Sequence, residues 1–275
     1  MERIKLSSWI TSLGLTLLLS VGLSAQTNCD EGAGPLRQVE PKGISSLEII
    51  KKFSAQEKLF KEMETHYSYT MEVSVQTLEG QVADGEFRRI SQISYNQGKR
   101  MENVLFAPQS TLTRISMTKE DFDDIDHRSP FALTPEDLPQ YDVTYVGEQK
   151  VDLLETYVFE VTPKHLEKGK RYFQGKVWVD TADFAVVKSC GKNVPEEIQP
   201  PKKKKHRPVQ HNVSPAFVTY REQFENKYWF PTYVRADETL PLLYGDSCHV
   251  REVIKYTKYK RADSDATAIS NAAPK

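Results

Sequence analysis

The chain has 275 residues and an almost balanced charge, with 37 Lys and Arg against 38 Asp and Glu. This balance excludes a strong overall attraction to nucleic acid, so no nucleic-acid partner is expected. The chain contains three Cys, and no two of them have C-x-x-C spacing. The paired-cysteine zinc and thioredoxin motifs are therefore excluded.

The first 25 residues are typical of a secretory signal peptide. Arg3 and Lys5 form a short basic region, and the apolar run at 9–23 that follows is too short for a membrane anchor. Cleavage after Ala25 is favoured by the small residues there, and cleavage after Ser24 is nearly as good. We therefore expect an exported, periplasmic protein that is cleaved near Ala25.

The remaining chain is long enough for two domains but also fits one β-rich domain. We expect a polar, disordered leader at 26–43, one domain at 44–262 and a disordered tail at 263–275. Cys190 and Cys248 are the pair inside the expected domain, whereas Cys29 lies in the leader. The choice between one disulfide and none stays open.

A helix is predicted from Ser45, because Ser45 and Glu48 form an S-x-x-E capping box. An apolar stripe at helical spacing follows, and the charged residues lie largely outside it. The stripe predicts a helix that covers an apolar surface. The stripe consists of Ile49, Phe53, Phe60 and Met63, and the charged set of Lys51, Lys52, Glu57, Lys58 and Lys61.

After His66 the apolar period changes to two, which predicts strands with one buried and one wet face. Short polar or Gly-containing links between the runs favour an antiparallel meander. About ten strands in one sheet must curl and be capped, and the first helix is the expected cap. Strand-like runs lie at 67–76, 87–95, 100–106, 111–117, 141–145, 156–161, 172–179, 184–190, 217–224, 228–234 and 248–259.

Two segments interrupt the meander. Residues 118–140 contain two helix starts, T-K-E-D-F and T-P-E-D-L, and predict a second lid. Their acidic cluster at 121–126 lacks the Gly and Glu of a calcium loop, so a solvated helix face is favoured. Residues 194–215 form a Pro- and Lys-rich insertion. Its basic run at 202–207 fits a solvated loop better than a site for anionic lipid headgroups.

Catalytic motifs are not found in the sequence. It contains no G-x-S-x-G elbow, no H-E-x-x-H and no phosphate-binding G-x-x-x-x-G-K. An unrecognised hydrolase site stays as an alternative, but we expect no enzyme activity, no cofactor and no metal.

Two blocks of the chain are especially distinctive, K-Y-W-F-P-T-Y-V-R-A-D at 227–237 and V-R-E-V-I-K-Y-T-K-Y-K-R at 250–261. Further blocks lie at 134–148, 154–161, 170–188 and 217–224. Together they resemble a bacterial outer-membrane lipoprotein-sorting family, the LolA-like family, whose fold superfamily includes LolB and RseB. The resemblance implies a mainly β fold with α: an unclosed antiparallel half-barrel meander that is covered by one or more helices.

The resemblance also implies a carrier that shelters acyl chains of a lipid or lipoprotein in the half-barrel. The alternative is an envelope sensor or structural module on the same fold, with a partner protein in the inner or outer membrane. We expect a monomer. Aromatic strand residues predict either a filled core or a cavity. The candidate cavity residues are Phe53, Phe60, Tyr69, Met71, Val73, Phe159, Val161, Trp178 and Trp229, of which the inward direction of the two Trp side chains is a guess.

Overall fold

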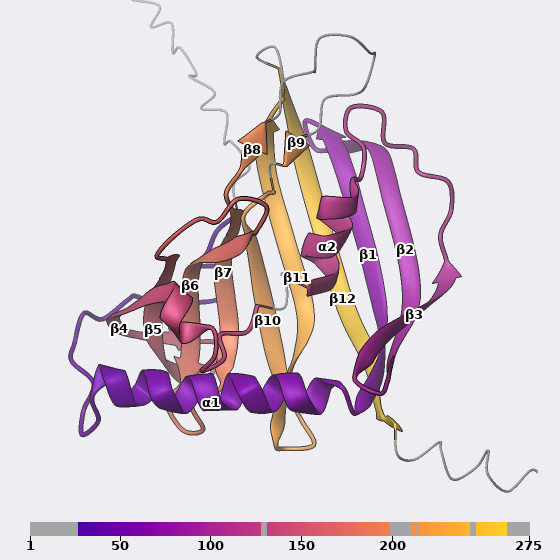
Figure 1. Ribbon diagram of the computed structural model, residues 1–275. Coiled ribbons are helices and arrows are strands. Elements are labelled where there is room, and N and C mark those ends of the chain that lie inside the picture. Colours follow the sequence, from indigo (N-terminus) through magenta and orange to yellow (C-terminus); the bar gives the residue numbers. More distant parts are fainter. Residues whose placement is uncertain (1–26, 128–130, 199–210, 213, 243–245, 263–275) are drawn as a thin grey trace, which may run out of the picture.

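A computed structural model describes residues 27–127, 131–198, 211–212, 214–242 and 246–262. Ten strands form one antiparallel sheet that does not close, and two α-helices lie on one of its faces (Figure 1). The predicted fold class, a mainly β unclosed half-barrel covered by helices, is confirmed. Among the described residues, no helix combines the length and the apolar character needed to cross a membrane.

The helical elements are α1 (Ser46–Glu64), α2 (Lys119–His127) and the 3-10 helix η1 (Leu138–Gln140). The strands of the large sheet are β1 (Tyr67–Glu79), β2 (Val82–Asn96), β3 (Lys99–Phe106), β4 (Tyr141–Val151), β5 (Leu154–Pro163), β6 (Tyr172–Asp180), β7 (Val186–Val194), β10 (Phe217–Phe224), β11 (Tyr228–Pro241) and β12 (Ser247–Arg261). The short strands β8 (Glu197–Ile198) and β9 (His211–Asn212) pair with each other.

The strand order is β3-β2-β1-β12-β11-β10-β7-β6-β5-β4. It consists of two meanders, which are joined where the first strand pairs with the last. In that pair, Met71 lies opposite Tyr256 and Val73 opposite Ile254. The chain ends of the domain are therefore brought together at the third and fourth strands of the sheet, while β3 and β4 form its two edges.

Helix α1 begins as predicted, because the Ser45 hydroxyl accepts a hydrogen bond from the backbone N–H of Glu48 at 3.2 Å. The Glu48 carboxylate lies 3.7 Å from Lys52 Nζ. The helix runs across the strands near one end of the sheet, as Figure 1 shows. Its buried Ile49 and Phe53 side chains join the core formed by the sheet.

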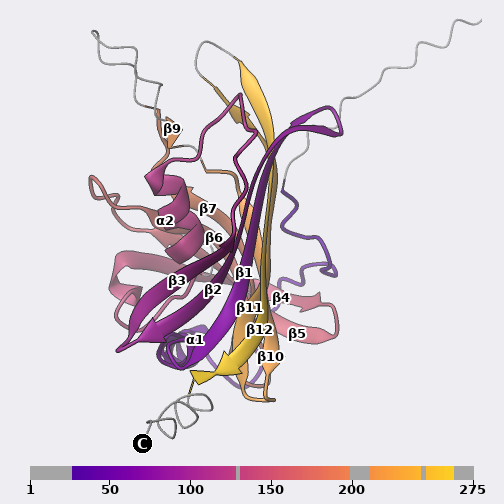
Figure 2. The same ribbon diagram turned by 90° about the vertical axis from the view of Figure 1, so that its right-hand side faces the viewer.

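Strand β1 follows the predicted alternation, with buried side chains at every second position from Tyr67 to Val75. The buried set points to the face that carries the helices, which we call the concave face. The opposite, convex face carries the residues 27–43, which Figure 2 shows on the other side of the sheet from α1 and α2. We call these residues the leader segment.

Two elements predicted from the sequence differ in the structure. Residues 111–117 form no strand, although the backbone N–H of Thr111 donates to Glu86 O at 2.9 Å. The second predicted helix start, at Thr134, gives only a turn closed by Asp137 and then η1. Alternating apolar residues thus do not suffice for a strand where no neighbouring strand supplies a full ladder.

The prediction of a disordered leader was wrong for residues 27–43, which lie along the convex face. Ala33 forms a bridge to Val151, and Arg37 forms one to Glu148, so the segment partly covers the β4 edge. Gly147 permits this approach, because a Cβ there would collide with the Arg37 carbonyl oxygen. The predicted signal peptide, the predicted tail at 263–275 and most of the 194–215 insertion lie outside the described residues.

Candidate functional site

Six of the nine predicted cavity residues lie in one apolar cluster on the concave face. They are Phe53 of α1, Tyr69, Met71 and Val73 of β1, and Phe159 and Val161 of β5. Apart from Tyr69, each is at most 1% exposed. A void that could admit water would leave exposed area on its walls, so these side chains are packed against one another. The rings of Phe53 and Phe159, for example, lie 5.4 Å apart.

The other three predicted residues lie elsewhere. Phe60 packs with Tyr67 and Phe230 in a second cluster at one end of α1. Trp178 points to the convex face, because its neighbours Val177 and Val179 belong to the concave cluster. Trp229 packs against the Trp178 cluster and donates to Asp183 Oδ2 at 2.6 Å. The guessed inward direction was therefore wrong for both Trp residues.

A buried ion pair attaches α1 to the sheet. Arg221 of β10 holds both carboxylate oxygens of Glu57, at 2.7 and 3.0 Å, and also donates to the Phe131 carbonyl oxygen. Both side chains are only 2–3% exposed. Burial raises the pKa of Glu57, and the guanidinium of Arg221 opposes that rise. Glu57 was counted with the charged residues that lie largely outside the apolar stripe, but its position four residues after Phe53 puts it on the stripe.

Helix α2 is attached through acidic side chains, so the prediction of a solvated acidic face was wrong. Asp124 is 5% exposed and lies 3.0 Å from an Arg171 nitrogen. Asp126 lies 3.1 Å from Arg89 and 3.2 Å from Arg100. The helix thus contacts β2 and β3 on one side and the start of β6 on the other. These ion pairs join residues from separate segments of the chain, so no local sequence pattern predicts them.

Glu252 lies beneath α2, on the concave face of β12. Burial raises its pKa to about 8, and the carboxylates of Asp121 and Asp124 add to the rise. The nearby Tyr256 hydroxyl is buried and has no hydrogen-bond partner among the described residues. The raised pKa favours the protonated form of the Glu252 carboxyl in the folded protein.

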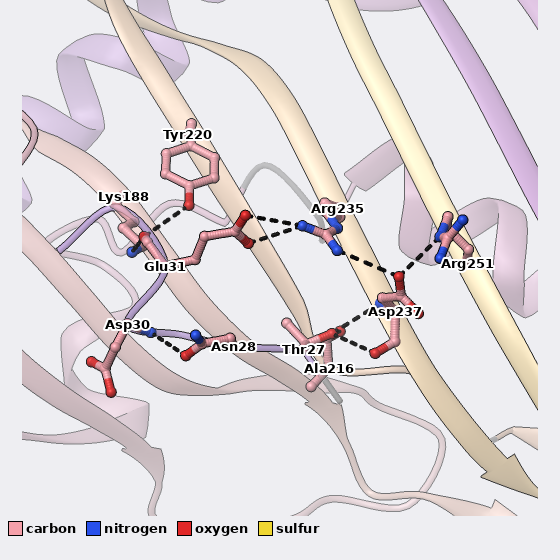
Figure 3. Close-up of polar contacts among 10 residues, drawn as sticks. All are labelled: Thr27, Asn28, Asp30, Glu31, Lys188, Ala216, Tyr220, Arg235, Asp237 and Arg251. Atoms are coloured by element: carbon pink, nitrogen blue, oxygen red, sulfur yellow. Dashed lines mark hydrogen bonds and ion pairs between the residues drawn. The ribbon is translucent and has the colours of Figure 1, made fainter. Parts of the chain in front are cut away.

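The convex face carries the leader segment, which is held by one disulfide and by several hydrogen bonds. Figure 3 shows polar contacts between the leader and the sheet. Cys29 forms a disulfide with Cys190, while Cys248 is free and buried. The pair considered from sequence, Cys190 with Cys248, is therefore not the one formed. Cys248 lies on the concave face with Val250, whereas Cys190 lies on the convex face beside the leader.

Lys188 is a buried cation under the leader segment. Its ammonium donates to the Glu31 carbonyl oxygen at 2.8 Å and lies 4.8 Å from the Trp178 ring centre. Burial lowers the pKa of Lys188, and the carboxylates of Asp30, Asp152 and Glu31 oppose this. The leader therefore supplies the carbonyl group that satisfies a charge on the sheet.

A hollow of about 330 Å³ also lies on the convex face, between the leader segment and strands β10 and β11. Its walls include Glu31 of the leader, Tyr220, Tyr233 and Arg235. Sequence reasoning missed this hollow because it depends on where the leader packs. No group of three or more metal-ligating side chains occurs within the part of the chain that the structure describes.

No protein-family model matches the sequence, and no curated protein matches it. Among solved structures, the chain is similar to a LolA superfamily protein from Nitrosomonas europaea, with 14% identity over 76% of this chain and 93% of that one, at a TM-score of 0.34. A putative outer membrane lipoprotein-sorting protein domain from Vibrio parahaemolyticus shares 14% identity over 81% of this chain and 98% of that one, at a TM-score of 0.35. A DUF1329 family protein from Desulfovibrio piger shares 16% identity over 77% of this chain and 93% of that one, at a TM-score of 0.35.

These similarities concern the fold alone. The molecule is a helix-covered, unclosed antiparallel half-barrel with an apolar concave face.

Proposed function

We propose that this protein is a periplasmic carrier or chaperone that shelters acyl chains of a lipid or lipoprotein against the concave face. The observation that supports it most is how the face is covered. The sheet keeps its own hydrogen-bond ladders, whereas neither α-helix makes a backbone hydrogen bond to a strand among the described residues. The helices can therefore move away without breaking the sheet.

The contacts that would break on opening are the polar ones at Glu57, Asp124 and Asp126. Charged groups regain water when they separate, which offsets part of the lost attraction. The apolar area that opening exposes is then available to the cargo. Each acyl methylene buried there contributes about 0.8 kcal/mol. The packed concave cluster is thus the closed state, and uptake requires displacement of a helix.

A pair of charge substitutions tests this proposal. Met71→Asp places a carboxylate in the concave cluster, where it cannot be solvated once cargo is bound, so acyl binding should be lost. Thr257→Asp is the matched control, because Thr257 is exposed and follows the concave residue Tyr256 on the same strand. Ser74 is a poorer control because its hydroxyl donates to Glu86, a carboxylate that would repel Asp.

The measurement is displacement of a fluorescent fatty acid, together with mass spectrometry of lipids that co-purify with the protein. Circular dichroism first establishes that each variant is folded. If Met71→Asp is unfolded, Val73→Thr provides the milder polar change on the same face. Equal acyl binding by wild type and a folded Met71→Asp variant would contradict the concave face as the acyl site.

A second candidate function, a sensor or structural module that binds a partner, is favoured by the β3 edge. Four apolar side chains on this outermost strand are 47–57% exposed: Met101, Val104, Leu105 and Phe106. Open strand edges accept a further strand from a partner. Leu105→Lys should then reduce capture of a membrane protein while acyl binding is unchanged. Capture without any bound lipid would favour the sensor over the carrier.

A further inference from the structure

The hollow on the convex face is lined by two aromatic rings from neighbouring strands. Tyr220 of β10 lies directly opposite Tyr233 of β11, and their ring centres are 6.4 Å apart at an angle of 36°. Val218 adds an apolar patch on the same face of β10. The faces of aromatic rings carry partial negative charge and attract cations.

The charged groups around the rings do not balance. Glu31 and Arg235 pair with each other, with an Arg235 nitrogen 2.9 and 3.1 Å from the two carboxylate oxygens (Figure 3). Asp152, at the turn between β4 and β5, also lines the hollow. Its carboxylate forms no ion pair and accepts no hydrogen bond within the described part of the chain, and it acts on Lys188 and Tyr220 only at longer range. The lining therefore keeps one unpaired negative charge.

The same carboxylates shift the pKa of the Tyr220 hydroxyl. Burial raises the pKa of Tyr220 to about 12, and the carboxylates of Glu31 and Asp152 add to the rise, while Arg235 opposes it. The two nearby cations are already engaged. Lys188 donates to the leader backbone and lies 5.3 Å from the Tyr220 ring centre, and Arg235 holds Glu31. A cation that enters from solvent thus meets a carboxylate without an ion-pair partner beside the Tyr233 ring, and it shares the Tyr220 ring with Lys188.

We propose that this hollow binds the cationic end of a basic polypeptide side chain, with Asp152 as its counter-ion and Tyr220 and Tyr233 as its walls. A guanidinium suits it well, because its plane stacks on aromatic rings while its N–H groups reach a carboxylate. A volume of about 330 Å³ fits a single side chain rather than a whole lipid. The site lies on the face opposite the proposed acyl site, so it does not depend on lipid binding.

The test is an NMR titration of the full chain with N-acetyl-arginine methylamide and N-acetyl-lysine methylamide. Shifts at Tyr220 and Tyr233 with a Kd of about 1 mM are expected for one side chain. Asp152→Asn should weaken binding about tenfold, because Asn keeps the shape and tolerates the positive φ of 50° at this turn. Asp142→Asn, which removes an exposed carboxylate elsewhere on β4, should change nothing.

Tyr233→Leu removes one ring without changing any charge and should weaken binding severalfold. Phosphoethanolamine tests the other source of an ammonium group, a lipid headgroup. Stronger binding of phosphoethanolamine than of both amino-acid probes would overturn the polypeptide assignment. No shift with any probe at about 10 mM, or equal affinity in wild type and Asp152→Asn, would overturn the site itself.

Discussion

The two faces of the sheet carry covers that are attached by different chemistry. On the concave face, α1 and α2 are held by packed apolar groups and by ionic side-chain contacts such as Glu57 with Arg221. On the convex face, the leader segment is held by a disulfide and by backbone hydrogen bonds such as Arg37 N–H to Glu148 O at 2.8 Å. The proposed carrier function requires that the first kind of cover can leave and return, whereas the disulfide keeps the second kind attached.

The largest effect should come from breaking the buried ion pair. Arg221→Met leaves the Glu57 carboxylate buried without its partner, so the free energy of unfolding should fall by about 4 kcal/mol, measured by urea denaturation. The matched control is Arg235→Met on the convex face, where the ion pair with Glu31 is half-exposed. Its loss should cost less than about 1 kcal/mol.

The double variant Glu57→Gln with Arg221→Met sharpens this result, because it removes the stranded charge. Most of the lost stability should return in it. Equal losses in Arg221→Met and Arg235→Met would show that burial does not distinguish the two covers.

Removal of the disulfide should have the next largest effect. Cys29→Ala removes a link between residues 161 positions apart, which should lower the free energy of unfolding by about 3 kcal/mol. Limited trypsin digestion should then cleave faster at Arg37, while acyl binding on the concave face is kept. Cys248→Ala, at the free buried cysteine, should leave cleavage at Arg37 unchanged. Unchanged protection of Arg37 in Cys29→Ala would mean that backbone contacts alone hold the leader.

Stability should also depend on pH through Glu252. Its folded-state pKa of about 8 lies above the ordinary value of 4.5, so the folded protein keeps a proton that the unfolded chain releases. This raised pKa therefore makes stability fall as pH rises from 4.5 to about 8. Glu252→Gln should remove that fall and raise the free energy of unfolding at pH 8, measured by denaturation across the pH range. If the stability of Glu252→Gln falls with pH in parallel with that of the wild type, the prediction is contradicted.

The smallest predicted effect concerns one hydrogen-bonding side chain of the leader segment. The Thr27 hydroxyl donates to Ala216 O at 2.7 Å and accepts from Asp237 N at 3.0 Å. Thr27→Val keeps the shape but removes both bonds, so the free energy of unfolding should fall by about 1 kcal/mol. The midpoint of thermal unfolding should fall by about 3 °C in Thr27→Val, whereas Thr27→Ser should keep most of the wild-type stability.

Local patterns predicted the elements of the fold well. The cap at Ser45 and the two-residue period of β1 depend only on neighbouring residues, and both are found in the structure. The count of strand-like runs, together with the need to cover a wide apolar face, predicted a curled meander covered by a helix, and the family resemblance implied that it is an unclosed half-barrel. These features follow from sequence because helix and strand periods are set within a few residues.

Long-range partners decided what the sequence left open. The pairing of β1 with β12, the disulfide of Cys29 with Cys190 and the ion pair of Glu57 with Arg221 each join segments far apart in the chain. No local pattern specifies such partners. For the same reason the polar leader was misjudged as disordered, since its order comes from the strand edge on which it packs.

In the candidate site too, some features follow from local sequence and others depend on long-range contacts. Parity along one strand placed Tyr69, Met71 and Val73 on a common face, because alternation is a local property of the backbone. The face on which Trp178 lies depends on how its strand is placed in the finished sheet. The hollow beside Tyr220 depends on the leader segment, whose Glu31 is 189 residues away from Tyr220 in the chain. Sequence determined which residues share a face, and tertiary contacts decided what covers each face.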